Sequence, residues 1–267
     1  MKKLLKIEFR RAFCHPLMAA ALVAGVLIAV SHVIFHVYPL QQYIFTEVYP
    51  LTVFQQWMGG ENTSVQPTLY FLLAPLLSAI PYLSTLHEDR HSGYIKNIFT
   101  RSAAMGYYGA KYVVTFLVSG LVAVVPLAVN LLLSALILPA AVPQAFTGLY
   151  PINNLSLMGD LFYTNPWLYI GLYLILDFVF FGLLATVGLL TAFLTEHVFV
   201  VVLSPFMVYL LTFAITQLTG RHEYCSYAFL RPSQPVVSQW AIVAGEIAVL
   251  ILLGGGYFVV AKKSESC

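Results

Sequence analysis

Residues 112–138 read YVVTFLVSGLVAVVPLAVNLLLSALIL, an unbroken apolar run without Asp, Glu, Lys or Arg. At a rise of about 1.5 Å per residue, a helix of this length crosses a hydrocarbon core of about 30 Å. Soluble domains are about 25% charged, whereas this chain of 267 residues is 9% charged and 60% hydrophobic. The composition excludes an ordinary soluble enzyme and a disordered chain, and it predicts a helical membrane protein.

Five further stretches have the same character. The six predicted spans are 17–37, 69–86, 112–138, 167–194, 198–218 and 239–260. The predicted fold class is therefore an all-α integral membrane protein with six transmembrane helices. Residues 1–16 precede this transmembrane domain of residues 17–260, and residues 261–267 follow it as a short tail.

Lys and Arg are concentrated on one side of the predicted membrane. Eleven of the 13 lie before the first span, between the second and third spans, or after the sixth. The two on the other side are Arg221 and Arg231. By the positive-inside rule, we expect a multi-pass protein of the plasma membrane with both termini in the cytoplasm.

Residues 1–16 are predicted to form an amphipathic interfacial helix. Leu5, Phe9 and Phe13 recur at helical spacing on one side, and Lys6 and Arg10 lie on the other. Such a helix is expected to contact anionic membrane lipid with its basic face. The alternative is a plain basic anchor that sets the orientation of the first span.

The longest predicted cytoplasmic loop, residues 86–111, reads LHEDRHSGYIKNIFTRSAAMGYYGAK. Gly93 is expected to end one helix, and a short apolar stripe follows at Tyr94, Ile95, Ile98 and Phe99. A short amphipathic helix that projects from a membrane bundle is typical of a segment that docks into a partner's groove. The alternative is a helix folded back onto the lipid.

This loop resembles the first cytoplasmic loop of the ABC-2 type permeases, the membrane subunits of ATP-binding cassette exporters. The matching positions, in order, are Glu88, Gly93, the segment Tyr94–Phe99, Arg101-Ser102 and Gly109-Ala110-Lys111. The six-span layout is similar as well. The chain departs from the pattern at Ser102-Ala103-Ala104, where a basic residue or proline is common.

The resemblance implies an N-terminal elbow helix and, at Tyr94–Phe99, a coupling helix that docks on a separate ABC ATPase subunit. The implied ATPase-coupling residues are Glu88, Gly93, Tyr94, Ile95, Ile98, Phe99 and Arg101. The family works as pairs of permease chains, so a second copy or a related chain is an expected partner.

The expected function is export of an amphipathic peptide, drug or lipid-like molecule. The chain has no Gly-x-x-x-x-Gly-Lys-Ser/Thr phosphate loop. We therefore expect it not to be an enzyme and to hold no cofactor, with ATP and Mg²⁺ bound by the partner ATPase. No nucleic-acid partner is expected.

A second hypothesis comes from His87-Glu88-Asp89-Arg90-His91, which matches the pattern H-E-x-x-H. On a helix this pattern places two zinc-binding imidazoles one turn apart, with the glutamate as general base. The alternative function is therefore an intramembrane zinc metalloprotease using His87, Glu88 and His91. Two charged residues in the middle of the motif favour ordinary interface residues and no metal.

Four polar residues lie inside predicted spans at similar depths, namely His32, Asn130, Asp177 and Glu246. Asp177 is about 15 Å and Glu246 about 10 Å from the outer end of its span. An ionised aspartate at a span centre costs about 2.5–3.5 kcal/mol. We expect these residues either to line a substrate pathway or to form hydrogen bonds between helices. Asp177 also allows a proton-coupled carrier as a minor alternative.

Overall fold

The computed structural model describes residues 2–44, 51–100, 103–144, 150, 152, 156–233 and 239–265. These residues are mostly helical and contain no strand. Six helical segments are long and apolar enough to cross a membrane. They are Pro16–Tyr43, Val65–His91, Ala104–Ile137, Pro166–Leu194, Val198–Thr219 and Trp240–Ser264. The predicted fold class is confirmed.

The first span consists of α2 (Pro16–His32), a π-helical turn η1 (Val33–Val37), α3 (Tyr38–Leu40) and η2 (Gln41–Tyr43). The second consists of α5 (Val65–Ala79) and α6 (Ser84–His91). The other four are α8 (Ala104–Ile137), α10 (Pro166–Leu194), α11 (Val198–Thr219) and α13 (Trp240–Glu265). Shorter helices are α1 (Lys2–Phe13), α4 (Val53–Gln56), α7 (Tyr94–Phe99), α9 (Gly159–Thr164), η4 (His222–Tyr224) and α12 (Ser226–Phe229).

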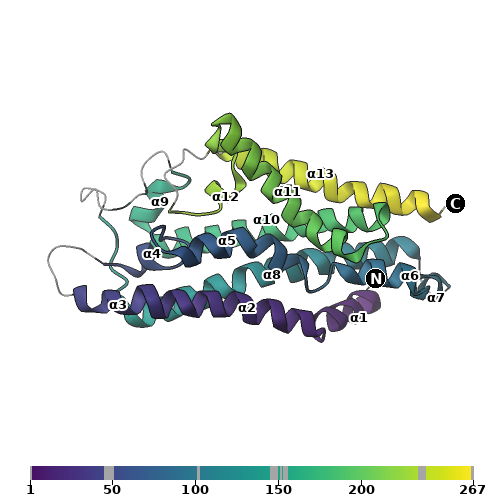
Figure 1. Ribbon diagram of the computed structural model, residues 1–267, viewed down its shortest axis with the longest axis horizontal. Coiled ribbons are helices and arrows are strands. Elements are labelled where there is room, and N and C mark those ends of the chain that lie inside the picture. Colours follow the sequence, from purple (N-terminus) through teal and green to yellow (C-terminus); the bar gives the residue numbers. More distant parts are fainter. Residues whose placement is uncertain are drawn as a thin grey trace.

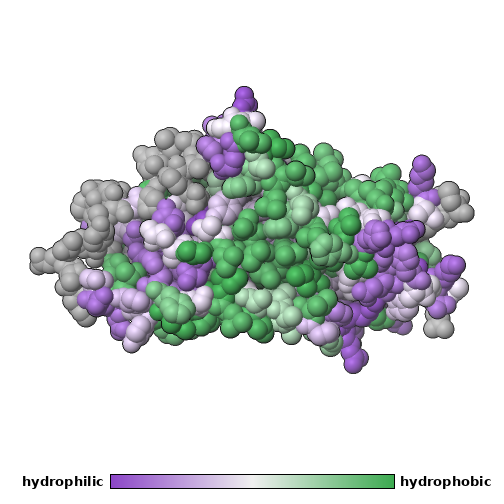
Figure 2. Space-filling model, in the orientation of Figure 1, coloured by the Kyte–Doolittle hydropathy of each residue, from purple (hydrophilic) through white to green (hydrophobic). Residues whose placement is uncertain are grey.

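The long helices run side by side along the longest axis of the molecule (Figure 1). Both termini lie at one end together with α1, α6 and α7, and we call this the terminal end. The opposite end carries α3, α4 and α9, and we call it the loop end. Hydrophobic side chains form a broad band between more hydrophilic ends (Figure 2), as expected for a bundle that crosses a bilayer.

The second and third spans extend beyond the predicted apolar runs at the terminal end. The second ends at His91 instead of residue 86, and the third begins at Ala104 instead of residue 112. These extensions carry Asp89 and Lys111, which form an ion pair with each other at 2.9 Å. Hydropathy ended the predicted spans at these charges, whereas their pairing allows the helices to continue.

Helices α8 and α10 pack closely at the centre of the bundle. A Cβ atom placed on Gly120 of α8 would lie 2.7 Å from the carbonyl oxygen of Phe178. One placed on Gly182 of α10 would lie 2.7 Å from the carbonyl oxygen of Phe116. Each helix thus presents a glycine to the backbone of the other, the kind of close approach that small residues permit between membrane helices.

Candidate functional site

Four charged side chains meet at the terminal end, where α1 packs against the second and third spans. This charge cluster consists of Glu8 and Arg11 of α1, Asp89 of α6 and Lys111 of α8. The Nζ atom of Lys111 lies 3.0 Å from Glu8 Oε2 and 2.9 Å from Asp89 Oδ2. Arg11 donates two hydrogen bonds to Asp89, at 2.9 and 2.8 Å. These bonds raise the pKa of Arg11 above its ordinary value. The formal charges of the four groups cancel.

Neighbouring hydroxyl groups complete the charge cluster. Tyr82 donates a hydrogen bond to Glu8, and Tyr107 donates one to Asp89 at 2.5 Å. Lys111 is fully buried and donates to Thr85 Oγ1 at 2.9 Å. Because each buried ion has an opposite charge and further hydrogen bonds, the network meets the condition under which buried ion pairs are tolerated.

The charge cluster connects α1 to the two spans that flank α7. Gly93 joins α6 to α7 in a left-handed conformation with φ of 73°, which glycine adopts without strain. The guanidinium of Arg11 also lies 5.2 Å from the ring centroid of Tyr94. The predicted coupling segment Tyr94–Phe99 is helical, and its first residue contacts α1.

The apolar side of α7 faces the bundle. Ile95 is buried, and the Phe99 ring makes edge-to-face contacts with Tyr107 and Tyr108 at centroid distances of 6.2 and 5.8 Å. Of the other predicted coupling residues, Ile98 is half-buried, Glu88 and Tyr94 are exposed, and Arg101 lies outside the described residues. The exposed face of α7 consists of Tyr94, Lys96 and Asn97. A docking partner would meet this face, since the predicted apolar stripe is largely used inside the molecule.

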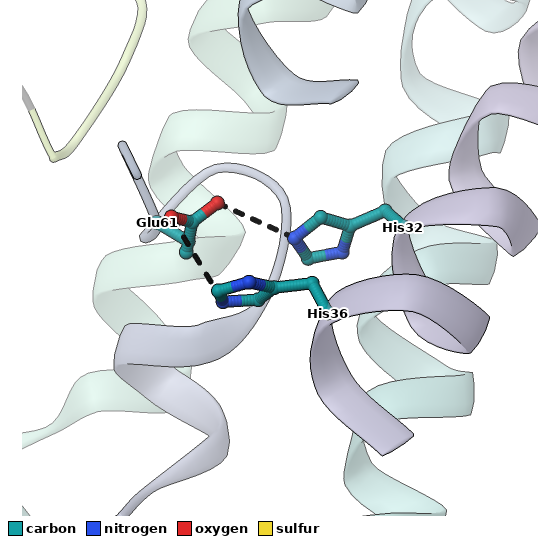
Figure 3. Close-up of side chains that lie close together, drawn as sticks. All are labelled: His32, His36 and Glu61. Carbon is teal, nitrogen blue, oxygen red and sulfur yellow. Dashed lines mark ion pairs between the residues drawn. The ribbon is translucent and has the colours of Figure 1, made fainter. Parts of the chain in front are cut away.

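A second polar cluster lies near the loop end, where His32 and His36 face Glu61 (Figure 3). The Nε2 atom of His32 lies 3.5 Å from Glu61 Oε2, and that of His36 lies 3.9 Å from Oε1. The two imidazole rings stack at a centroid distance of 5.1 Å. His32 and Glu61 are buried, and His36 is partly exposed. With Asn130, these residues make up what we call the histidine cluster.

The carboxylate of Glu61 is held by the residues just before α5. It accepts hydrogen bonds from the backbone and hydroxyl groups of Thr63 and Ser64, including Ser64 N at 2.8 Å. Burial acts to raise the pKa of Glu61, but the nearby imidazole of His32 and the hydrogen bonds from Ser64 and Thr63 more than offset it. The pKa is therefore held well below its usual range, and Glu61 remains a fixed anion.

Replacing Glu61 with glutamine is expected to lower the free energy of unfolding at pH 7 by roughly 2 kcal/mol, because charge-assisted hydrogen bonds are lost. A carboxylate with a depressed folded pKa contributes stability above the unfolded pKa, near 4.3, and loses it as the pH falls further. The difference between wild type and E61Q should therefore shrink below about pH 4.3. The measurement is the free energy of unfolding of both proteins in detergent, at pH values above and below about 4.3. Glu196→Gln, at an exposed position, is the control, and a pH-independent difference would contradict the assignment.

The histidine cluster has the composition of a metal site, since one ligand atom from each of His32, His36 and Glu61 lies within 4.8 Å of the others. The hydrogen bonds around His32, however, indicate that its Nε2 atom carries a proton and does not bind a metal. Asn130 accepts from the backbone N–H of Met58 at 2.7 Å and donates to the carbonyl of Ala29 at 2.9 Å, which fixes the orientation of its amide. The same Nδ2 lies 3.0 Å from His32 Nδ1, which must accept. The proton of neutral His32 is then on Nε2, facing Glu61, where a metal would need a lone pair.

The four predicted intramembrane residues fall in three places. His32 and Asn130 are hydrogen-bonded between α2 and α8. Asp177 is buried in α10, and neither of its carboxyl oxygens has a hydrogen-bond partner among the described residues. Glu246 of α13 accepts a hydrogen bond from Ser226 Oγ at 2.6 Å. Among the described hydrogen bonds of these four residues, one joins two of them, the bond between His32 and Asn130.

The H-E-x-x-H motif lies in α6, and the rings of His87 and His91 contact each other in a tilted arrangement at a centroid distance of 4.2 Å. Its two middle residues have structural contacts. Asp89 belongs to the charge cluster, and Arg90 donates to the carbonyl of Ala192 at 2.6 Å. Within the described residues, three potential ligand atoms come together at the histidine cluster and not at this motif. Among the described residues, the motif therefore has no third protein ligand for zinc.

Sequence reasoning missed Glu8, Arg11, Asp89, His36 and Glu61 as site residues. One signal was available for Glu8, because it lies four residues from both Leu4 and Ala12 and so shares their helical face. Arg11 was counted only as a positive-inside charge, and Lys111 was counted as such a charge and as part of the loop resemblance. Comparison with known proteins returned no match to a family model, a curated protein or a solved structure.

Proposed function

We propose that the chain is the permease subunit of an ATP-driven ABC exporter of the plasma membrane. In this proposal the terminal end is cytoplasmic, and a separate ATPase that binds ATP and Mg²⁺ docks there. The observation that carries it is the charge cluster, which joins α1 to both spans that flank α7. Because α7 packs on α8 through Ile95 and Phe99, a force on α7 would be transmitted directly to the spans.

The proposed mechanism is mechanical. Nucleotide-driven closure of two ATPase subunits moves α7, and α6 and α8 follow as parts of one rigid connection. Two permease chains, identical or related, then change their relative packing and move an amphipathic substrate outward. The zinc metalloprotease alternative has weaker support, since it needs a third zinc ligand beside His87 and His91.

The exposed face of α7 provides the sharpest test of docking. The double variant Lys96→Glu with Asn97→Asp should weaken binding of the ATPase at least about tenfold, the effect of losing roughly 1.4 kcal/mol at an interface. Its stability should be unchanged because both side chains are exposed. Affinity is measured by titrating the purified ATPase onto the chain in lipid nanodiscs.

Lys3→Glu is the matched control, since Lys3 is exposed at the same end on α1. Equal affinity for the wild type, the double variant and this control would refute docking through α7.

A further inference from the structure

A pocket of about 610 Å³ lies between α10, α11 and α13 and is bounded by α12. Drug-sized ligands occupy pockets of about 300–1,000 Å³ that are mostly apolar with a few polar groups. The lining of this pocket fits that description. Its apolar residues include Phe180, Leu184, Val208, Val249, Leu250 and Leu253.

Among the described residues that line the pocket, Glu246 is the one acid, and none is Lys, Arg or His. Ser226 donates its hydrogen bond to Oε2, which orients the carboxylate and leaves Oε1 for another donor. No described ion pair involves Glu246. An acid placed in an apolar membrane pocket without a basic partner favours a cation supplied from outside the chain.

The walls of the pocket face the surroundings of the bundle. Val249 and Leu253 of α13 both line the pocket and are 55% and 38% exposed, so this side of the pocket is open to the surroundings. A ligand dissolved in the bilayer can therefore approach from the side. Glu246 lies about 9 Å along α13 from Trp240, a depth that suits a charged group kept near the membrane surface while its apolar body extends inward.

We infer that this pocket binds a cationic amphiphile, with the cationic group beside Glu246 and the apolar body against Phe180, Leu184 and Leu253. As a statement about the exported substrate, the inference rests on the proposed exporter function. Binding itself requires no ATPase, so it is measured on the purified chain alone. A failure of binding is thereby distinguished from a failure of the exporter proposal.

The test uses two probes of the same shape and opposite charge, tetraphenylphosphonium and tetraphenylborate, titrated onto the chain in nanodiscs of a zwitterionic lipid. We expect saturable binding of the cation and at least about tenfold weaker binding of it by Glu246→Gln. Binding of the anion should be unchanged or stronger in this variant. Asp160→Asn, at an exposed position of α9, controls for loss of one negative charge and should bind like wild type.

A second variant keeps the test independent of the folding of E246Q. Val249 lines the pocket and is 55% exposed, so Val249→Trp fills space without disturbing the core and should weaken cation binding. Equal affinity for both ions, cation binding that neither variant changes, or no saturable binding would each overturn the inference. Those results would mean a pocket occupied by lipid or by a neighbouring chain without selection for charge.

Discussion

Replacing Lys111 with methionine is expected to lower the free energy of unfolding by about 3–5 kcal/mol, the usual cost of removing one partner from a buried ion network. The variant leaves the carboxylates of Glu8 and Asp89 buried with Arg11 as their remaining cationic partner in the charge cluster. The loss is measured by denaturant titration in detergent micelles, followed by tryptophan fluorescence.

A compensating variant separates charge from packing. Adding Glu8→Gln to Lys111→Met restores neutrality, because the Arg11–Asp89 pair remains balanced. We expect this double variant to regain part of the lost stability. Lys6→Met, at an exposed position of α1, should behave like wild type. A Lys111 variant as stable as the Lys6 variant would show that the charge cluster does not hold α1 to the spans.

Alanine at Gly120 or Gly182 is expected to destabilise the bundle by about 1–3 kcal/mol each, the typical cost of overpacking. The added Cβ would meet a backbone carbonyl oxygen at 2.7 Å in both cases, and a backbone atom cannot rotate away as a side chain can. The Phe116 and Phe178 rings also contact each other edge to face at 5.6 Å, so α8 and α10 are closely packed around both glycines.

The same two helices provide matched controls. A Cβ atom on Gly109 of α8 or Gly171 of α10 would meet no atom within 4 Å. Alanine at these positions should be neutral or stabilise by up to about 1 kcal/mol, since alanine is the better helix former. Thermal unfolding of the four variants in one detergent gives the comparison. Equal effects at all four positions would mean that α8 and α10 are not in close contact.

The six spans and the short α7 were predictable because each follows from a local pattern. Long apolar runs without charge predict membrane helices, and Gly93 marks the turn before Tyr94–Phe99. The charge cluster was not predictable, because it joins residues far apart in the sequence, such as Arg11 and Asp89. Hydropathy treats every charge as a reason to end a span, so it placed Lys111 in a loop.

The histidine cluster was predictable only in part, because it also joins residues that are far apart in the sequence. His32 and Asn130 were singled out because they are polar residues at similar depths in two predicted spans, and they are hydrogen-bonded to each other. Glu61 belongs to a connecting segment, and only the three-dimensional structure brings it to His32. The apolar stripe of α7 was visible in the sequence, but the sequence could not show that Tyr107 and Tyr108 cover Phe99.

Vanadate-sensitive ATP hydrolysis by the reconstituted complex tests most directly whether a separate ATPase drives this chain. The chain is co-expressed with an ABC ATPase subunit from the same organism, purified and placed in liposomes. We predict a stable complex whose hydrolysis is lost in the Lys96→Glu, Asn97→Asp variant and kept in Lys3→Glu. A chain that purifies without the ATPase and leaves its hydrolysis unchanged would contradict the account, and stoichiometric zinc lost on His91→Ala would favour the protease.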